Sequence, residues 1–445
     1  MIELQERANT IFGEHFQQRE SELASFGGAA LHELRRLSLA RFEAAGWPTH
    51  KDEEWKYTSL RPLTELELRP SYAADVVASD LERLPLGLTG AIRLVFVNGR
   101  FQEHLSDLSR LPQGVVLRNL ASALQEDVPA RLGSIASLEG KLGSTNDERF
   151  KDLNNAFLVE GAYLSVPRNV VVEDPVHIVF LTKADQAGFV THPRVLVEVG
   201  ENAQVKVIES YVGLTGSYFT NAVTEVFVEA NGVAEHVRVQ DETDEAFHIA
   251  TSAVHQEADS TYTSYSVQFG GRVGRVDVNL WLNGEHTESR LDGVYVAHGE
   301  QVLDNKTRID HAKANCHSFE VYKGILMGRS TGVFNGKIFV YEDAQKTDAK
   351  QTNQALLLSP TATINTKPQL EIFADDVKCT HGATVGQLRE DALFYLRSRG
   401  IPLEEARALL TYAFASEVLE RITVEPVRVG LEQLLYEKLA EARGL

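Results

Sequence analysis

Cysteine is scarce in this chain, which has only two among its 445 residues. Two cysteines cannot form the disulfide framework of a small secreted protein. No run of apolar residues approaches the roughly 20 that a membrane-spanning helix needs. The opening residues MIELQERANTIF are amphipathic and acidic, unlike a secretory signal peptide. These absences predict a cytoplasmic protein without structural disulfides.

Positive charge is also in short supply, with 44 Lys and Arg against 63 Asp and Glu and a formal net charge of -19. This surplus of acid opposes binding to nucleic acid or to an anionic membrane. A phosphate-binding G-x-x-x-x-G-K-[ST] loop is absent, and the glycine-rich run GGRVG at 270–274 does not open a helix. We therefore do not expect the chain to be an ATPase by itself.

The chain is too long for a single core, and its pattern divides it into three parts. Residues 1–160 are predicted to be helical and mixed, with a helix pair that stops at Gly46 and a tight β-hairpin at Asn98-Gly99. Residues 161–384 are predicted to form a β core. Residues 385–445 return to a helical period and are predicted to be helical.

Short alternating apolar runs recur throughout the β core and are separated by turn dipeptides such as Asn231-Gly232, Asn283-Gly284 and Asn335-Gly336. This pattern indicates a sandwich, a barrel, a propeller or a solenoid. The stretch is longer than the ~100 residues of one sandwich, and it has few hairpin dipeptides for so many strands. We therefore predict a mainly β fold built on a parallel β-helix, although no strict sequence repeat marks its turns.

The sequence FADDVKCTHGATVG, near the end of this core, is the first candidate for chemistry. If it is extended, alternation places Cys379 and His381 on one face. A thiolate and an imidazole are metal ligands, but a closed site needs about four, so this strand supplies half of one. The alternative is that Cys379 is a small buried hydrophobe. The other cysteine adds no ligand pair, because Cys316 and His317 are adjacent and would point to opposite faces.

An interface is the second candidate. The Cys379/His381 strand lies at the C-terminal end of the β core, where an exposed last turn would offer unpaired backbone groups to a partner strand. The missing ligands could then come from another chain.

Two other functions stay open from the residues alone. Asn365-Thr366-Lys367, Asp375-Asp376 and His381-Gly382 resemble the order of motifs in galacturonases, which suggests a carbohydrate-active β-helix enzyme. The three motifs lie close together in sequence, whereas in those enzymes they come from separate turns. A self-associating structural β-solenoid is the other alternative.

Many motifs together resemble the SufB/SufD family of iron-sulfur cluster assembly scaffolds. The likeness extends over most of the chain and is specific. It rests on the following segments: Gly46-Trp47-Pro48, Glu53 to Thr58, Leu153 to Gly161, Tyr322 to Ile325, Phe334 to Ile338, Gln345 to Ala349, Gln351, Leu356 to Ser359, Lys367 to Ile372, Ala374 to Thr384 and Phe394 to Ile401. The low cysteine content fits the cysteine-poor branch of the family.

The resemblance implies a right-handed parallel β-helix flanked by helical regions, and a non-catalytic scaffold role. It implies pairing with SufB through the ends of the two β-helices, and docking of the ATPase SufC on the C-terminal helices, with Phe394, Tyr395 and Arg397 as candidate contacts. These aromatic residues could instead pack against the following helix. A homodimer of the free chain and a flavin cofactor are left open.

By the same resemblance, His381 is a ligand for iron or for a nascent iron-sulfur cluster that is held transiently and shared with SufB. ATP-driven closure of SufC would expose it at the interface, and the family branch is associated with iron acquisition. Cys379 is a second candidate ligand, with core packing as its alternative. Asp375 or Asp376 could orient the histidine.

Overall fold

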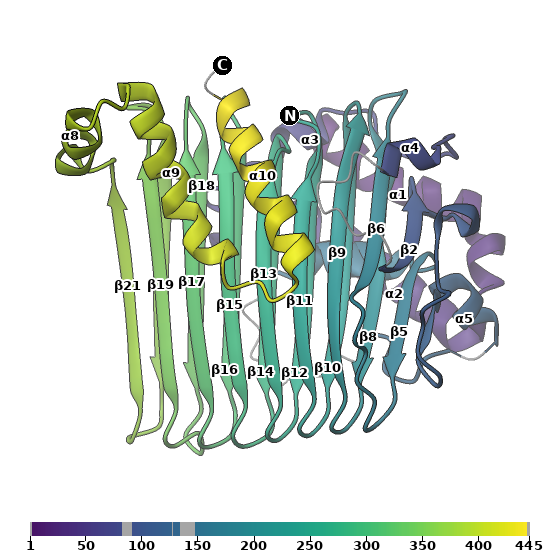
Figure 1. Cartoon of the computed structure of the whole chain (residues 1–445). Helices are drawn as coiled ribbons and strands as arrows, with labels where there is room; N and C mark the ends of the chain where they lie inside the picture. The colour runs from purple at the N-terminus through teal and green to yellow at the C-terminus, as the bar shows by residue number, and fades with distance from the viewer. Residues whose placement is uncertain (1, 82–90, 127, 134–146, 443–445) are drawn as a thin grey trace.

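The computed structural model of this chain describes residues 2–81, 91–126, 128–133 and 147–442. The chain is mainly β, with a β-solenoid of about eight turns and helices at both ends (Figure 1). The described helices are α1 Ile2–Ala24, α2 Gly28–Ala45, α3 Arg61–Thr64, α4 Ala78–Leu81, α5 Leu120–Glu126, α7 Arg149–Ala156, α8 Glu390–Ser398, α9 Leu403–Leu419 and α10 Glu425–Glu441, with short 3-10 turns at Glu53–Trp55 and Glu103–Leu105.

The solenoid consists of two facing sheets between which the chain alternates. The first sheet has the order β20-β18-β16-β14-β12-β10-β8-β5-β4, and the second has the order β21-β19-β17-β15-β13-β11-β9-β6-β2-β3. β5 pairs in parallel with β8 and β6 with β9, and from β8 onward each strand pairs in parallel with the strand two positions later. The predicted parallel β-helix is confirmed.

The strands have the following bounds: β1 Arg69–Pro70, β2 Ile92–Val97, β3 Arg100–Phe101, β4 Val116–Asn119, β5 Gly161–Val166, β6 Val176–Lys183, β7 Phe189–Thr191, β8 Arg194–Val199, β9 Gln204–Thr215, β10 Tyr218–Val228, β11 Val233–Asp241, β12 Phe247–Gln256, β13 Thr261–Phe269, β14 Val273–Leu282, β15 Glu288–Ala297, β16 Val302–His311, β17 His317–Leu326, β18 Thr331–Val340, β19 Asp348–Leu357, β20 Thr363–Ile372 and β21 Lys378–Gly386. The core therefore extends from Gly161 to Gly386.

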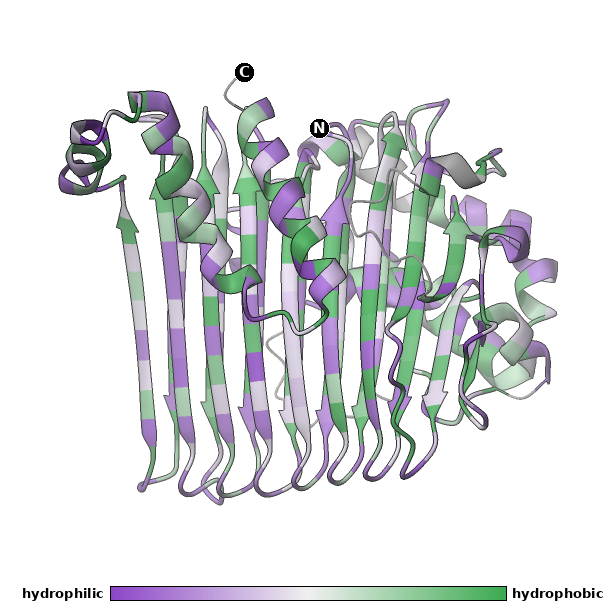
Figure 2. Ribbon diagram, viewed as in Figure 1, coloured by the Kyte–Doolittle hydropathy of each residue, from purple (hydrophilic) through white to green (hydrophobic). Residues whose placement is uncertain are grey.

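Alternation of side chains explains why these segments form a solenoid. Bands of apolar and polar residues alternate along the strands (Figure 2), and the apolar set lines a continuous interior between the sheets. Equivalent corners carry one residue per turn in the left-handed conformation: Asn169, Asn202, Asn231, Asp259, His286, Asn315 and Lys346. Their N–H groups donate to a carbonyl of the next turn, as Asn231 does to Ala258 at 2.9 Å. The repeat thus resides in backbone geometry, and it is met by several residue types.

The N-terminal region covers the first end of the solenoid and the outer face of the first sheet. The predicted hairpin is confirmed, because Val97 pairs with Arg100 across Asn98-Gly99, and both turn residues have positive φ. β2 then adds to β6, and β4 adds to β5, so this end of both sheets is occupied. The helix pair α1 and α2 packs beside α7, which lies on β10 and β12.

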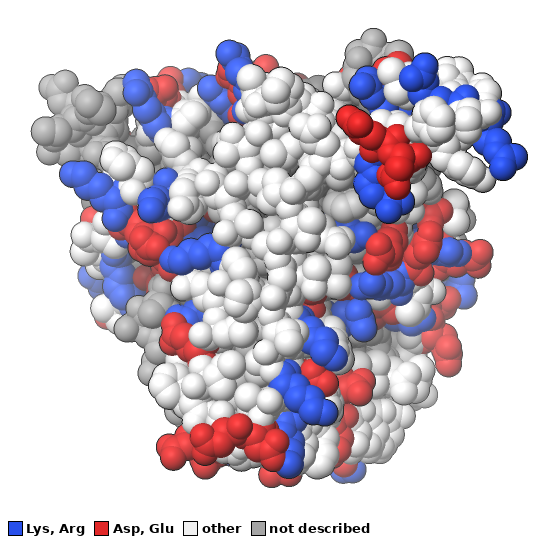
Figure 3. Space-filling model, turned by 90° about the vertical axis from the view of Figure 1, so that its left-hand side faces the viewer, with Lys and Arg blue, Asp and Glu red and all other residues white. Residues whose placement is uncertain are grey.

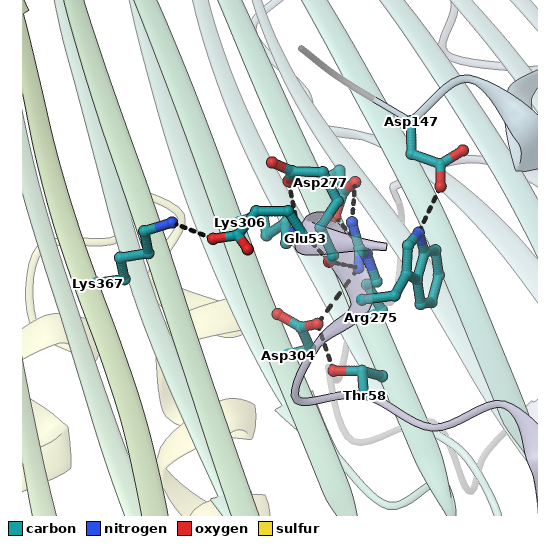
Figure 4. Close-up of polar contacts among 10 residues, drawn as sticks. Glu53, Thr58, Asp147, Arg275, Asp277, Asp304, Lys306 and Lys367 are labelled. Carbon is teal, nitrogen blue, oxygen red and sulfur yellow. Dashed lines mark hydrogen bonds and ion pairs between the residues drawn. The ribbon is translucent and has the colours of Figure 1, made fainter. Parts of the chain in front are cut away.

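One N-terminal segment reaches along the first sheet towards its far end (Figure 4). Arg275 of β14 is 1% exposed, lies 3.7 Å from the centre of the Trp55 ring, and donates to the Glu54 carbonyl at 2.6 Å. Lys367 of β20, the last strand of this sheet, donates to Glu53 at 2.6 Å. The segment therefore contacts strands from the middle of the solenoid to its last turn.

The C-terminal helices pack on the second sheet (Figure 1). Apolar side chains of α9 and α10 join those of β11, β13, β15 and β17 in one cluster, and Tyr265 donates to the Arg421 carbonyl at 2.6 Å. Among the described residues, no helix combines the length and apolar character that crossing a membrane requires.

Candidate functional site

The C-terminal end of the solenoid is open. β20 and β21 are the outermost strands of their sheets, and each pairs on one side only, with β18 and β19. Within the described part of the chain, no strand covers their outer edges. Apolar side chains are exposed here, with Phe373 at 59% and Val385 at 46%. An edge of this length presents a row of free backbone donors and acceptors.

This end face carries little charge at its centre, as the view onto it shows (Figure 3). Charged side chains gather around the rim. A chain with a formal net charge of -19 would not be expected to leave the centre of a face nearly uncharged. Depletion of charge at the centre with a charged rim is typical of a protein interface.

His381 lies on this end face. It is exposed on β21 and pairs in register with Gln351 of β19, which is 1% exposed. Because side chains of paired residues in a parallel sheet lie on the same face, His381 belongs to the interior column of the solenoid at the point where that column meets solvent. The structure therefore places the predicted ligand at the mouth of the interior.

Cys379 shares this face two residues earlier and pairs with Ala349. It is half-buried and packs against a cluster that contains Ile338 and Val340. Burial raises the pKa of the Cys379 thiol, so the free chain favours the uncharged thiol. This packing agrees with the alternative that Cys379 is a small buried hydrophobic residue. A role of Cys379 as a metal ligand stays a prediction for an assembled complex.

Further ligands do not gather around His381. Among the described residues, no group of three or more His, Cys, Asp or Glu side chains is placed to hold a metal ion. Asp376 lies in the turn before β21, where its carboxylate pairs with Lys346 and its N–H donates to Gln345 at 3.0 Å. Neither Asp375 nor Asp376 has a described bond to the histidine. One chain thus contributes part of a site.

A buried polar pair stands behind His381 and was not predicted from the sequence. Glu320 of β17 pairs in register with Gln351, and Gln351 donates to the Glu320 carboxylate at 2.7 Å. Burial raises the pKa of Glu320 to about 7, and the Thr307 and Gln351 hydrogen bonds oppose that shift. Only the presence of Gln351 among the family motifs could have indicated that this residue matters.

The candidate docking residues lie on α8, which projects from the end of the solenoid (Figure 1). Phe394 is 75% exposed and Tyr395 is 58% exposed, so the alternative that they pack against α9 is wrong. Arg397 is exposed on the same helix. A cavity of about 660 Å³ separates α8 and α9 from the corner of the last turns. Exposed aromatic residues of this kind are enriched in interfaces.

The galacturonase-like motifs do not converge. Asn365 lines a small cavity on the outer face of the first sheet beside Glu53, whereas His381 faces the interior at the end of the second sheet. Asp376 is held at a corner by Lys346. A glycosidase needs its two carboxyl groups on either side of one bond, and this arrangement does not provide that.

The second cysteine lies away from the end face. Cys316 is fully buried in the core, and its thiol donates to the Gly284 carbonyl at 3.2 Å. Burial raises the pKa of this thiol as well. Cys316 is a packed core residue.

Comparison with known proteins agrees with this geometry. Residues 180–414 match the family described as SUF system FeS cluster assembly, SufBD core domain, and residues 6–178 match the SufBD protein N-terminal region. The chain belongs to the SufB/SufD family of iron-sulfur cluster assembly proteins.

Relatives named SufD cover nearly the whole chain. The chain is 33% identical to the iron-sulfur cluster assembly protein SufD of Escherichia coli over 91% of each chain. It is 34% identical to an iron-sulfur cluster assembly SufBD family protein of Synechocystis, over 87% of this chain and 86% of the relative. It is 27% identical to Bacillus subtilis SufD, over 92% of this chain and 94% of the relative.

Proposed function

We propose that this chain is a non-catalytic, SufD-type scaffold subunit that pairs with SufB through its open end and binds the ATPase SufC through its C-terminal helices. The observation that carries the proposal is the uncovered last turn, which brings an exposed histidine and two free strand edges to one face with little charge at its centre. A cytoplasmic location goes with this proposal.

Strand addition is the mode of pairing that the open end supports. The N–H of Lys378 donates to the carbonyl of Thr347, the residue before β19, at 2.8 Å. By alternation, the N–H groups that point to the free edge are those of Cys379, His381, Ala383 and Val385. A second solenoid with a matching end would continue both sheets. Backbone bonds would supply affinity, and the uncharged side chains would be buried.

Iron or a nascent cluster is the cargo of this site in our proposal. A neutral imidazole of His381 would supply one ligand, and a thiolate of SufB would complete the set across the interface. A shared site explains why the described residues of one chain hold only part of a metal site. It also allows release, because separating the two ends removes half of the ligands.

Docking of the ATPase would use α8 and its exposed aromatic residues Phe394 and Tyr395, with Arg397 beside them. α9 continues from α8 onto the second sheet, where Lys323 of β17 pairs with Glu417. Movement of α8 could therefore be passed to the strands behind it.

The test is reconstitution of the full chain with SufB and SufC, followed by counting of iron and acid-labile sulfide with and without ATP. The proposal predicts a stable three-component complex that gains iron and sulfide. A chain that forms only a homodimer and ignores SufB and SufC would favour the structural solenoid, since the same free edges fit a second copy.

A further inference from the structure

Gln351 stands out because its side chain is buried but only half satisfied. It is 1% exposed, and its Nε2 donates to Glu320 at 2.7 Å. Its Oε1 is buried and has no hydrogen-bond partner among the described residues. Leaving a buried amide group without a hydrogen bond costs roughly 1–3 kcal/mol, so a donor close to Gln351 Oε1 would stabilise the structure.

The orientation of this amide is set by its neighbour. The Gln351 amide turns its NH2 group to a Glu320 oxygen and its carbonyl away. Above the Glu320 pKa of about 7 the carboxylate only accepts, so it holds the amide in this orientation. The residue next to Gln351 on the outer strand is His381, in register and on the same face. Neighbouring strands are about 4.8 Å apart, which brings an imidazole N–H within reach of the carbonyl.

The opposite wall of the interior makes room for this arrangement. Gly336 of β18 faces Gln351, and a Cβ atom at Gly336 would lie 2.0 Å from Gln351 Nε2 and 2.6 Å from its Cδ. Any side chain at Gly336 would push the amide out of place. This explains a glycine in the middle of a strand, where it otherwise weakens the sheet.

We propose that Gln351 is the positioning residue of His381: its Oε1 accepts one ring N–H of the histidine, while Glu320 holds the amide in that orientation. The inference rests on the proposed role of His381 as a ligand. A fixed N–H leaves the other ring nitrogen as a lone pair directed at the cargo, and it sets the ring angle before the partner arrives. Glu320, Gln351 and His381 then form one line across β17, β19 and β21.

The experiment uses the full chain with 15N-labelled histidine, with the His381 ring signals assigned by their loss in His381→Gln. At a pH well above 7, where the ring is neutral and Glu320, with its pKa of about 7, is ionised, nitrogen shifts report which nitrogen carries the proton. We expect one tautomer to dominate in the wild type. Gln351→Met should move the ratio towards that of the exposed His50 in the same spectrum, and an unchanged ratio would overturn the proposal.

Two further variants separate this effect from loss of structure. Asn353→Leu is the matched control: Asn353 is also 1% exposed on β19 and also has an unpartnered oxygen among the described residues, but it pairs with Ala383. It should leave the His381 ratio unchanged. Gly336→Ala keeps Gln351 but displaces it, and should reproduce the Gln351→Met result.

A swap provides the rescue. In the double variant Glu320→Gln with Gln351→Glu, the amide donates outward and a carboxylate accepts the His381 N–H, so the wild-type tautomer should return. In the assembled complex, Gln351→Met should also weaken Fe²⁺ binding by about 10- to 100-fold. If His381→Ala leaves cluster yield unchanged while the tautomer results hold, the proposed function fails and the positioning role stands. If His381→Ala lowers cluster yield but Gln351→Met leaves the tautomer ratio unchanged, the positioning role fails and the proposed function stands.

Discussion

The guanidinium group of Arg275 lies 3.7 Å from the centre of the Trp55 ring, on a strand far from Trp55 in sequence. Arg275 also donates to Asp277 at 2.9 Å and lies 3.5 Å from Asp304, which itself accepts from Thr58 at 2.5 Å. This cluster fixes the N-terminal segment to the middle of the first sheet (Figure 4). From there the segment reaches the last turn.

Arg275→Leu should destabilise the chain strongly. The change leaves the buried Asp304 without its cationic partner, and breaking a buried pair in this way costs about 3–5 kcal/mol. Urea unfolding followed by tryptophan fluorescence should show a clearly lower midpoint. Lys367→Ala, which breaks the exposed pair with Glu53, is the control and should move the midpoint little. Equal effects of the two changes would contradict this account of the cluster.

Acid should destabilise the chain partly through His311. This residue is fully buried, and burial lowers its pKa to about 3. The unfolded histidine binds a proton below about pH 6.5, whereas the folded one stays neutral down to about pH 3. Between these values the unfolded state holds more protons, so stability is complete above pH 6.5 and is lost as the pH falls.

His311→Gln should remove that share of the pH dependence. The slope of unfolding free energy against pH, measured by urea titrations between pH 7 and 5, should decrease by up to ~1.4 kcal/mol per pH unit. His50→Gln, at an exposed position, is the matched substitution. If His311→Gln keeps the full wild-type slope, His311 is not the source of this pH dependence of stability.

Pairing through the free edge should be sensitive to a single proline. The N–H of Ala383 points outward from β21, so Ala383→Pro removes a donor that the chain itself does not use. We expect loss of association with SufB in size-exclusion chromatography and a thermal midpoint close to that of the wild type. Ala383→Val keeps the donor and should still associate. Undiminished association of the proline variant would argue against strand addition.

Docking of SufC should depend on the exposed aromatic residues of α8. Replacing Phe394 and Tyr395 by serine should leave stability within about 0.5 kcal/mol, because both side chains are in solvent. Affinity for SufC should fall by at least about tenfold, since buried aromatic anchors dominate interfaces. Tyr436→Ser on α10, at 63% exposure, is the control. The affinity is measured by calorimetric titration with SufC. If the double serine variant binds SufC as tightly as the wild type, α8 is not the docking site.

The sequence predicted the solenoid from alternation, but it did not reveal the repeat. The corner positions need a left-handed residue, and Asn231, Asp259, His286 and Lys346 all meet that need. What recurs from turn to turn is a backbone conformation that several residue types can adopt, so the sequence shows no repeated residue pattern. The hairpin at Asn98-Gly99 was predictable because both residues of that turn favour positive φ.

Half of the candidate site was also predictable. Alternation placed Cys379 and His381 on one face, and parallel register confirms this. The partners behind them could not be found from sequence, because Glu320 and Gln351 meet only through strand pairing across neighbouring turns. Likewise, alternation could not tell that Cys379 would be half-buried while His381 is exposed, which depends on where the solenoid ends.

His381→Ala tests the central claim most directly. The variant is assembled with SufB and SufC, the intact complex is isolated, and iron and acid-labile sulfide are counted after incubation with ATP. We predict an assembled complex with cluster content reduced to a small fraction of the wild type, because one ligand of the shared site is gone. Thr380→Ala, on the outer face of the same strand, should retain wild-type content. Full cluster content in the His381→Ala complex would contradict the account.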